Sequence, residues 1–210
     1  MTTGQKPIRV LMVDDHALLR NGIRRLIGAE SDMQLVAEAS TGREAVEEFR
    51  IHRPDVTLMD LQMPEMNGIE AIIAIRGEFP EARIIVLSTY SGDVQVARAL
   101  KAGARAYLLK TNVNRELLAA IRAVHAGQKR IPAEVASGLA EHTGEEELTE
   151  REIDVLRLIA AGNANKEIAA QLELAEDTIK RHVTNILSKL GANDRTHAVT
   201  IGLSRGIIEL

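Results

Sequence analysis

The sequence has no cysteine and no tryptophan, and aromatic residues make up only 2% of its 210 positions. Without cysteine, neither a disulfide framework nor a thiolate metal site can form. The scarcity of aromatic side chains argues against a protein that stacks on single-stranded bases. The sequence shows no charged-then-apolar pattern of the signal-peptide kind and no apolar run of roughly 18 residues, the length that a membrane span needs. We therefore expect a cytoplasmic location and no membrane partner.

A strong charge of either sign is missing too. The 26 Lys and Arg residues nearly balance the 30 Asp and Glu residues, for a formal net charge of -4 at pH 7. So small an excess identifies no partner, and a nucleic-acid site would need local basic charge. The hydrophobic content of 45% is typical of globular domains, and the length allows two modest domains or one large one.

Five short apolar runs alternate with amphipathic segments between Ile8 and about Ala126. The runs are IRVLMV, MQLVAEA, DVTLMD, ARIIVLS and AYLLK, and the segments after them repeat apolar residues near the helical period. Strands that are apolar on both faces are typical of parallel sheets covered by helices, with right-handed crossovers. The pattern predicts an α/β fold of five βα repeats, a doubly wound, flavodoxin-like parallel sheet.

Polar residues end or follow four of these runs, and ligands of such sheets bind beyond the carboxyl ends of the strands. They are Asp14 and Asp15 after the first run, Asp60 at the end of the third, Ser88 at the end of the fourth and Lys110 at the end of the fifth. Three carboxylates at one sheet edge repel one another unless a cation lies among them. Oxygen ligands without His or Cys favour Mg²⁺ as that cation.

A carboxylate beside Mg²⁺, with a lysine and a hydroxyl opposite, is typical of a phosphoryl-acceptor site. Asp60 would attack phosphorus, the Lys110 ammonium would pair with one phosphoryl oxygen, and the Ser88 hydroxyl would donate to another. Each residue alone has a simpler interpretation, because a strand-end Asp is usually a helix cap and a strand-end Lys a solvated charge. The five residues together, at the ends of four strands, favour the phosphoacceptor site.

At these residues the chain resembles the receiver domains of response regulators. The resemblance runs from Ile8 to Ala126 through VDDH, MDLQMPEMNGIE, LST and AYLLKT. It implies that a histidine kinase phosphorylates Asp60, and that Ser88 and Tyr107 form a switch in which the hydroxyl moves toward the phosphoryl group and the ring fills the vacated space. It also implies a Mg²⁺ site made of Asp14 (largely through metal-bound water), Asp15, Asp60 and the backbone carbonyl of Gln62.

The pattern changes after the fifth repeat. Residues 127–146 contain Gly, Pro and three closing Glu, and predict a linker with a short helix near Ala133 to Ala140. Residues 147–210 then begin with Thr149 as a helix cap and Glu152 three positions on, the capping-box spacing. The segments NKEIAAQL and LAEDTIKRHVTNILSKLG, joined by a tight turn, have the outline of a helix-turn-helix. We predict domains over 1–126 and 147–210.

The longer of these helices carries the candidate DNA contacts. Its apolar residues are spaced to face a core. The residues left on the outer face are Lys180, Arg181, Thr184, Asn185, Ser188 and Lys189. Such side chains can contact phosphates and base edges in a major groove. A basic helix is more often just a solvated face, but four basic residues and one acid lie between Lys180 and Arg195.

This half is similar along its length to the LuxR-type four-helix DNA-binding domain, so the whole chain is identified as a member of the NarL/FixJ family of response regulators. The resemblance implies that the last helix, Asp194 to Ile208, pairs two domains through Val199 and Leu203, so that a dimer binds paired half-sites. It implies base contacts from Lys180, Arg181 and Thr184, and phosphate contacts from Thr178, Asn185 and Lys189.

The two halves together predict a transcription factor controlled by phosphorylation rather than an enzyme. The expected partners are double-stranded promoter DNA, a cognate sensor histidine kinase, a second copy of the chain on phosphorylation, and RNA polymerase. An enzyme with an aspartyl-phosphate intermediate is an alternative, but it needs an acid two residues after the nucleophile, where this chain has Gln62. Two others are an interaction module that leaves the DNA helix unused, and a receiver that switches without phosphorylation.

Overall fold

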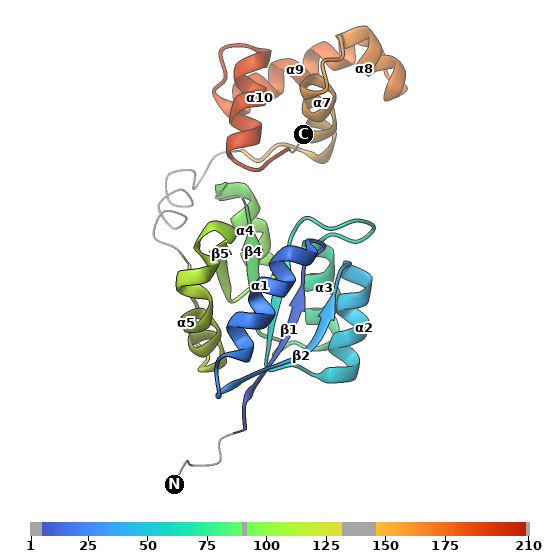
Figure 1. Cartoon of the computed structure of the whole chain (residues 1–210). Helices are drawn as coiled ribbons and strands as arrows, with labels where there is room; N and C mark the ends of the chain where they lie inside the picture. The colour runs from blue at the N-terminus through green and yellow to red at the C-terminus, as the bar shows by residue number, and fades with distance from the viewer. Residues whose placement is uncertain (1–5, 90–91, 132–145, 209–210) are drawn as a thin grey trace. The chain divides into compact units, whose positions relative to one another are not determined.

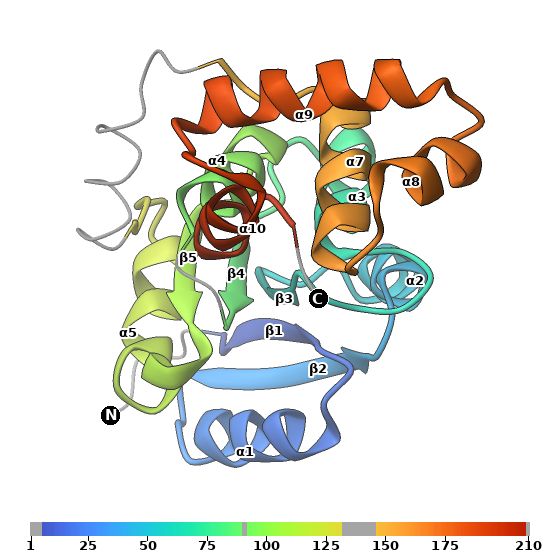
Figure 2. The same cartoon turned by 90° about the horizontal axis from the view of Figure 1, so that it is seen from above.

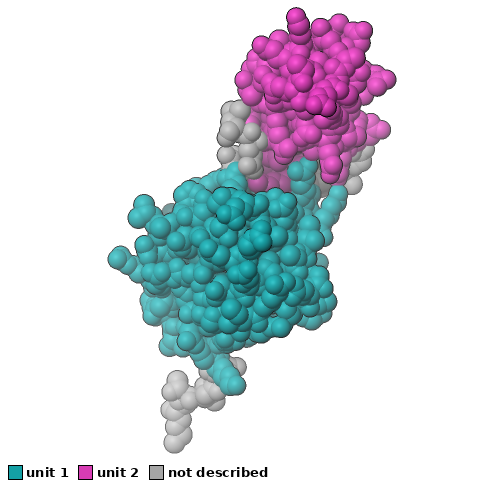
Figure 3. All heavy atoms as spheres, turned by 90° about the vertical axis from the view of Figure 1, so that its right-hand side faces the viewer, with its two compact units in different colours: residues 1–90, 96–136 teal, residues 91–95, 137–210 magenta. Residues whose placement is uncertain are grey.

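The computed structural model of the protein describes residues 6–89, 92–131 and 146–208. The chain divides into two compact units, residues 1–90 with 96–136 and residues 91–95 with 137–210 (Figure 3). The short linker helix expected near Ala133 to Ala140 lies outside the described residues.

A parallel sheet of five strands forms the centre of the first unit (Figure 1). Its strand order is β2-β1-β3-β4-β5, and every neighbouring pair is parallel. This is the order of flavodoxin-like sheets, which confirms the predicted fold. The strands are β1 (Ile8–Val13), β2 (Met33–Ala39), β3 (Val56–Asp60), β4 (Ile84–Ser88) and β5 (Ala106–Leu109).

Helices cover both faces of this sheet (Figure 2). On one face lie α1 (Ala17–Gly28) and α5 (Val113–His125), whose apolar residues share a core with side chains from the strands. On the other face lie α2 (Gly42–His52), α3 (Gly68–Glu78) and α4 (Asp93–Ala102). Because the sheet is buried on both sides, its strands are continuous apolar runs rather than alternating ones.

The fifth strand differs from the prediction at its end and along its edge. It ends at Leu109, and Lys110 already belongs to a 3-10 turn, η1 (Lys110–Asn112). Along the edge, the Tyr107 amide donates to the Arg130 carbonyl at 3.1 Å, and the Arg130 amide donates to the Arg105 carbonyl at 3.0 Å. Arg130, in the segment that the sequence assigns to the linker, therefore forms an isolated parallel bridge with Ala106 at the edge of β5.

The second unit is built from helices. The predicted capping box is confirmed, since the Glu152 amide donates to Thr149 Oγ1 at 3.3 Å and the Thr149 amide donates to the Glu152 carboxylate at 2.9 Å. The last helix is shorter than predicted, because Arg205 ends it and Gly206 takes a left-handed φ of 66°. The helices are α7 (Glu150–Ala160), α8 (Asn165–Gln171), α9 (Glu176–Leu190) and α10 (Arg195–Ser204). No helix in the described parts of the chain is both long and apolar enough to cross a membrane.

Candidate functional site

The carboxyl ends of β1 and β3 bring Asp14 and Asp60 to the ammonium of Lys110. Lys110 Nζ lies 2.7 Å from Asp60 Oδ2 and 2.9 Å from Asp14 Oδ2. The side chains of Asp14 and Asp60 are 0% and 2% exposed, and that of Lys110 is 13% exposed. One ammonium thus bridges two buried carboxylates that the chain places 46 positions apart at the same sheet edge.

Asp15 and His16 complete an acidic cluster at this edge. Ligand atoms of Asp14, Asp15, His16 and Asp60 lie within 4.8 Å of one another, and His16 Nδ1 is 2.6 Å from Asp15 Oδ1. Sequence reasoning included the three acids but not His16. Asp14 Oδ2 is a buried oxygen whose partner among the described residues is the Lys110 ammonium. Three carboxylates lie within 4.8 Å of one another here, and one ammonium pairs with two of them, so the oxygen donors form a set that fits a hard divalent cation.

Burial and charge shift the pKa values of the bridged groups. Burial raises the pKa of Asp60 above its ordinary value, and the nearby Asp14 charge adds to this, although Lys110 acts in the opposite direction. Burial alone would lower the pKa of Lys110, but its bonds to Asp60 and Asp14 outweigh that effect and raise it. The ammonium therefore stays charged, while the cluster as a whole remains under-compensated and would gain from a further cation.

The loop after β3 fixes the backbone of Asp60. The Gln62 amide donates to Asp60 Oδ1 at 3.2 Å, and the Gly68 amide donates to the Leu61 carbonyl at 3.0 Å. A Cβ at Gly68 would overlap the Asp60 carbonyl oxygen, so only glycine lets α3 begin this close to the strand end. The sequence shows Gly68 as a turn residue, but it carries no signal for this close approach.

Ser88 and Tyr107 lie on neighbouring strands and are buried, with exposed fractions of 2% and 0%. Tyr107 is opposite Val86 in the register of β4 and β5, and Ser88 is two residues beyond Val86. Residues two apart on a strand point to the same face, so the hydroxyl and the ring share one face of the sheet. Ser88 thus ends β4 on the face from which the Tyr107 ring extends.

Helix α9 has the two faces that its sequence predicts. Ile179 and Ile186 are buried in the core of the unit. The outer face has Thr178 half-buried at its start, and the residues exposed there are Lys180, Arg181, Thr184, Asn185 and Ser188. Lys180 Nζ lies 3.0 Å from Asp177 and 3.7 Å from Glu176, and all three side chains are largely exposed.

Lys189 does not lie on the outer face, where the sequence placed it. Its side chain is 17% exposed, and its Nζ is 3.0 Å from Glu152 Oε2 and 3.2 Å from the Glu147 carbonyl. The expected orientation was wrong because the long side chain reaches across to a buried carboxylate at the start of α7. Val199 and Leu203, which are expected to pair two DNA-binding domains, are half-buried and pack partly against the core of their own unit.

Comparison with known proteins relates both halves of the chain to families. Residues 10–122 match the response regulator receiver domain, and residues 146–201 match the luxR family of bacterial regulatory proteins. The chain is 38% identical to the response regulator protein VraR of Staphylococcus saprophyticus, covering 97% of this chain and 100% of that protein. It is 43% identical to the transcriptional regulatory protein LiaR of Bacillus subtilis, covering 91% of this chain and 94% of that protein.

A solved structure shares the fold over nearly the whole chain. The two-component response regulator RcsB, in its complex with DNA, is similar with a TM-score of 0.68 and 26% identity, covering 95% of this chain and 99% of RcsB. The resemblance therefore includes both units and not the sheet alone.

Proposed function

The chain belongs to the response regulators that join a receiver domain to a LuxR-type DNA-binding domain, and from this we propose that phosphorylation of Asp60 controls its binding to promoter DNA. The observation that carries the proposal is the buried Asp60 carboxylate, 2.7 Å from Lys110 in a cluster with more negative than positive charge. A cytoplasmic location and a cognate sensor histidine kinase follow from the same proposal.

The proposed reaction is transfer of a phosphoryl group from a phosphohistidine of the kinase to Asp60. A carboxylate oxygen of Asp60 forms a bond to phosphorus while the phosphorus–nitrogen bond breaks, and the imidazole nitrogen keeps the electron pair and takes up a proton. Lys110, already at 2.7 Å from the carboxylate, would pair with a phosphoryl oxygen. The Ser88 hydroxyl would donate to another oxygen and so draw Tyr107 into a second position.

The acidic cluster suits Mg²⁺, which would be held by Asp14, Asp15, Asp60 and the carbonyl of Gln62. The fit rests on the oxygen-rich donor set, in which three clustered carboxylates are met by one ammonium that pairs with Asp14 and Asp60. When bound, Mg²⁺ neutralises charge on phosphoryl oxygens. The residues of the chain would hold and orient the phosphoryl group around it.

In the second unit we propose that α9 enters the major groove of the DNA. Lys180, Arg181 and Thr184 would contact bases, and Thr178 and Asn185 would contact phosphates. Lys189, also expected at a phosphate, could reach one only by leaving Glu152. Val199 and Leu203 of α10 would pair the DNA-binding units of two copies of the chain. RNA polymerase is the other proposed protein partner.

We propose a regulator rather than an enzyme that turns over phosphate. Such an enzyme needs a second acid two residues after the nucleophile, and that position is Gln62. A regulator keeps its phosphoryl group long enough to shift a binding equilibrium, whereas an enzyme passes it on. Measured release of inorganic phosphate in many turnovers per chain would favour the enzyme.

The test is DNA binding with and without an acyl-phosphate donor. The full-length protein, treated with the acyl-phosphate donor, first selects DNA from a random pool. The selected DNA is then titrated with wild type and with Asp60→Asn. We expect the donor to tighten wild-type binding roughly 5- to 150-fold, the usual range of such coupling, and to leave Asp60→Asn unchanged. Equal affinities, with Asp60 shown by mass spectrometry to carry the phosphoryl group, would refute the proposal.

A further inference from the structure

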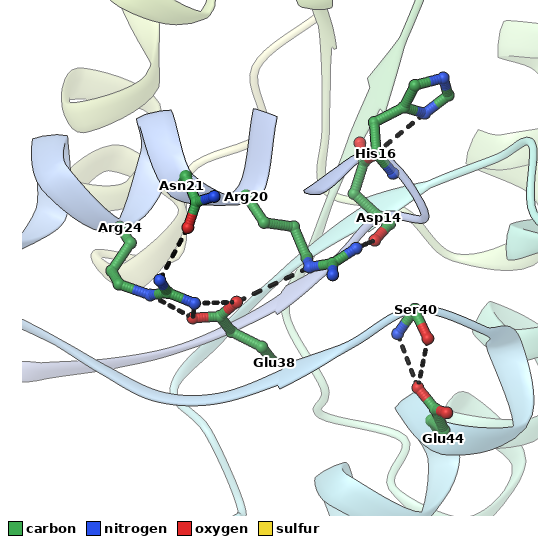
Figure 4. A network of polar contacts seen from close by, with 8 residues as sticks. All are labelled: Asp14, His16, Arg20, Asn21, Arg24, Glu38, Ser40 and Glu44. Carbon is green, nitrogen blue, oxygen red and sulfur yellow. Dashed lines mark hydrogen bonds and ion pairs between the residues drawn. The ribbon is translucent and has the colours of Figure 1, made fainter. Parts of the chain in front are cut away.

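Asp14 is held at each of its polar groups by a different part of the first unit. Its amide donates to the Ala39 carbonyl of β2 at 3.1 Å, and its Oδ1 accepts from the His16 amide at 2.8 Å. Its Oδ2 pairs with Lys110, as described above. Its carbonyl oxygen accepts a hydrogen bond from a guanidinium nitrogen of Arg20 at 2.5 Å (Figure 4).

Arg20 is itself held in place by an ion pair with Glu38. It lies on α1, and its Nε is 3.7 Å from Glu38 Oε2 on β2. Arg24, one turn further along α1, binds the two carboxylate oxygens of Glu38 at 2.6 Å and 2.7 Å but makes no contact with Asp14 (Figure 4). The side chains of Arg20 and Glu38 are only 21% and 22% exposed. A chain of contacts thus runs from Arg24 through Glu38 and Arg20 to the end of β1.

The carbonyl that Arg20 holds belongs to the peptide group joining Asp14 to Asp15. A peptide group is planar, so fixing its carbonyl oxygen also fixes the direction in which the chain continues to Asp15. Asp15 needs such support because its side chain is 36% exposed and contacts the exposed His16. The place of its carboxylate in the cluster therefore depends mainly on the backbone.

We propose that Arg20 is a positioning residue that presents Asp14 and Asp15 for divalent-cation binding. This inference rests on the proposed function, because it concerns the same acidic cluster. A charged donor to a carbonyl makes a stronger bond than a neutral one, and the fork of a guanidinium contacts Asp14 and Glu38 at once. Residues that orient metal ligands typically change metal affinity 10- to 100-fold when replaced.

The experiment measures Mg²⁺ affinity of the full chain by titration, followed through backbone amide shifts. Arg20→Met should raise the Mg²⁺ dissociation constant roughly tenfold. Arg24→Met is the matched control: it loses a guanidinium bound to the same Glu38, but none bound to Asp14, and should change the constant by about twofold or less. Arg20→Lys keeps the charge without the fork, and should fall between wild type and Arg20→Met.

Labelling of Asp60 by a small phosphodonor gives a second readout. Arg20→Met should be labelled slowly at low Mg²⁺ and at close to the wild-type rate at saturating Mg²⁺, because the variant changes affinity rather than the nucleophile. An unaltered dissociation constant in Arg20→Met, or equal weakening in Arg24→Met, would overturn the inference. If Arg20→Met does not fold, Glu38→Gln, which loosens Arg20 without removing it, should weaken Mg²⁺ binding by a smaller factor, and no weakening would overturn the inference.

The outcome also separates this inference from the proposed function. If wild type binds Mg²⁺ and is labelled at Asp60, and Arg20→Met does both equally well, the positioning role of Arg20 is refuted and the proposed function stands. Wild type that neither binds Mg²⁺ nor accepts the label would refute the proposed function itself.

Discussion

Each unit of the molecule buries a lysine against carboxylates, but the two ion pairs differ in their charge balance. In the first unit, Lys110 faces Asp14 and Asp60, with Asp15 close by. In the second, Lys189 lies 3.0 Å from Glu152, whose carboxylate also accepts the Thr149 amide. The lysine of the first unit is outnumbered, whereas that of the second meets one acid.

The pKa shifts of the two acids agree with this difference. For Asp60, burial prevails over Lys110 and the pKa is raised. For Glu152, burial acts upward too, but the Thr149 amide and the Lys189 ammonium outweigh it and the pKa is lowered. A balanced, hydrogen-bonded pair serves to join helices, whereas an unbalanced buried cluster indicates a site for a cation or a reaction.

Removing the lysine of the unbalanced cluster should have the largest effect. Lys110→Met leaves two buried carboxylates without their ammonium, and breaking a buried pair in this way typically costs about 3–5 kcal/mol. We expect this loss in the free energy of unfolding of the first unit, measured by urea unfolding in the presence of a chelator and followed through backbone amide signals assigned to each unit. Added Mg²⁺ should restore part of it, and a loss that Mg²⁺ leaves untouched would break the comparison.

Breaking the balanced pair of Lys189 and Glu152 should cost less stability, and the loss should not depend on divalent ions. Glu152→Gln keeps the shape of the capping residue but removes the partner of Lys189, so we expect the second unit to lose about 1–3 kcal/mol. Glu167→Gln is the control, because Glu167 accepts the Ala164 amide at 2.6 Å at the same place in α8 but is exposed. Its cost should be about 0.5 kcal/mol or less. Equal costs in urea unfolding would show that the buried ion pair with Lys189 adds nothing to the stability of α7.

On the exposed face of α9, charges should affect DNA binding instead of stability. Arg181 makes no ion pair with any described residue, whereas Lys180 is engaged by Asp177 and Glu176 and must leave them to reach DNA. Arg181→Ala should therefore weaken binding by about 1–3 kcal/mol, and Lys180→Ala by less. Titration of the phosphorylated protein with the selected DNA checks this, and a larger loss for Lys180→Ala would contradict it. Asp177→Asn should tighten binding by freeing Lys180.

Local and topological features of the sequence predicted much of this molecule. The parallel sheet follows from continuous apolar runs, and parallel strands necessarily bring Asp14, Asp60 and Lys110 to one edge. The capping box of Thr149 was predictable because it depends on residues three apart.

Contacts that depend on the packing of distant elements were not predictable. Lys189 meets Glu152, 37 positions away, only because α9 packs on α7. Gly68 matters because α3 begins against the Asp60 carbonyl. The Arg20 contact with a backbone carbonyl leaves no pattern in the sequence, since any residue could supply that carbonyl.

The smallest expected effect is a pH dependence of opposite sign in the two units. The pKa of Asp60 is raised above 3.8 in the folded chain, so its contribution to stability is complete below pH 3.8 and is lost as the pH rises through the folded value. The pKa of Glu152 is lowered below 4.5, so its contribution is complete above pH 4.5 and is lost as the pH falls through the folded value.

Comparison of each acid with its amide variant isolates these contributions from those of other groups. In a chelator, Asp60→Asn should gain stability relative to wild type as the pH rises above 3.8, whereas the deficit of Glu152→Gln should shrink as the pH falls below 4.5. One proton limits either slope to about 1.4 kcal/mol per pH unit. Slopes of the same sign would mean that Lys110 offsets the burial of Asp60 as fully as Lys189 and the Thr149 amide offset that of Glu152, and the two sites would then not differ in how their charges are compensated.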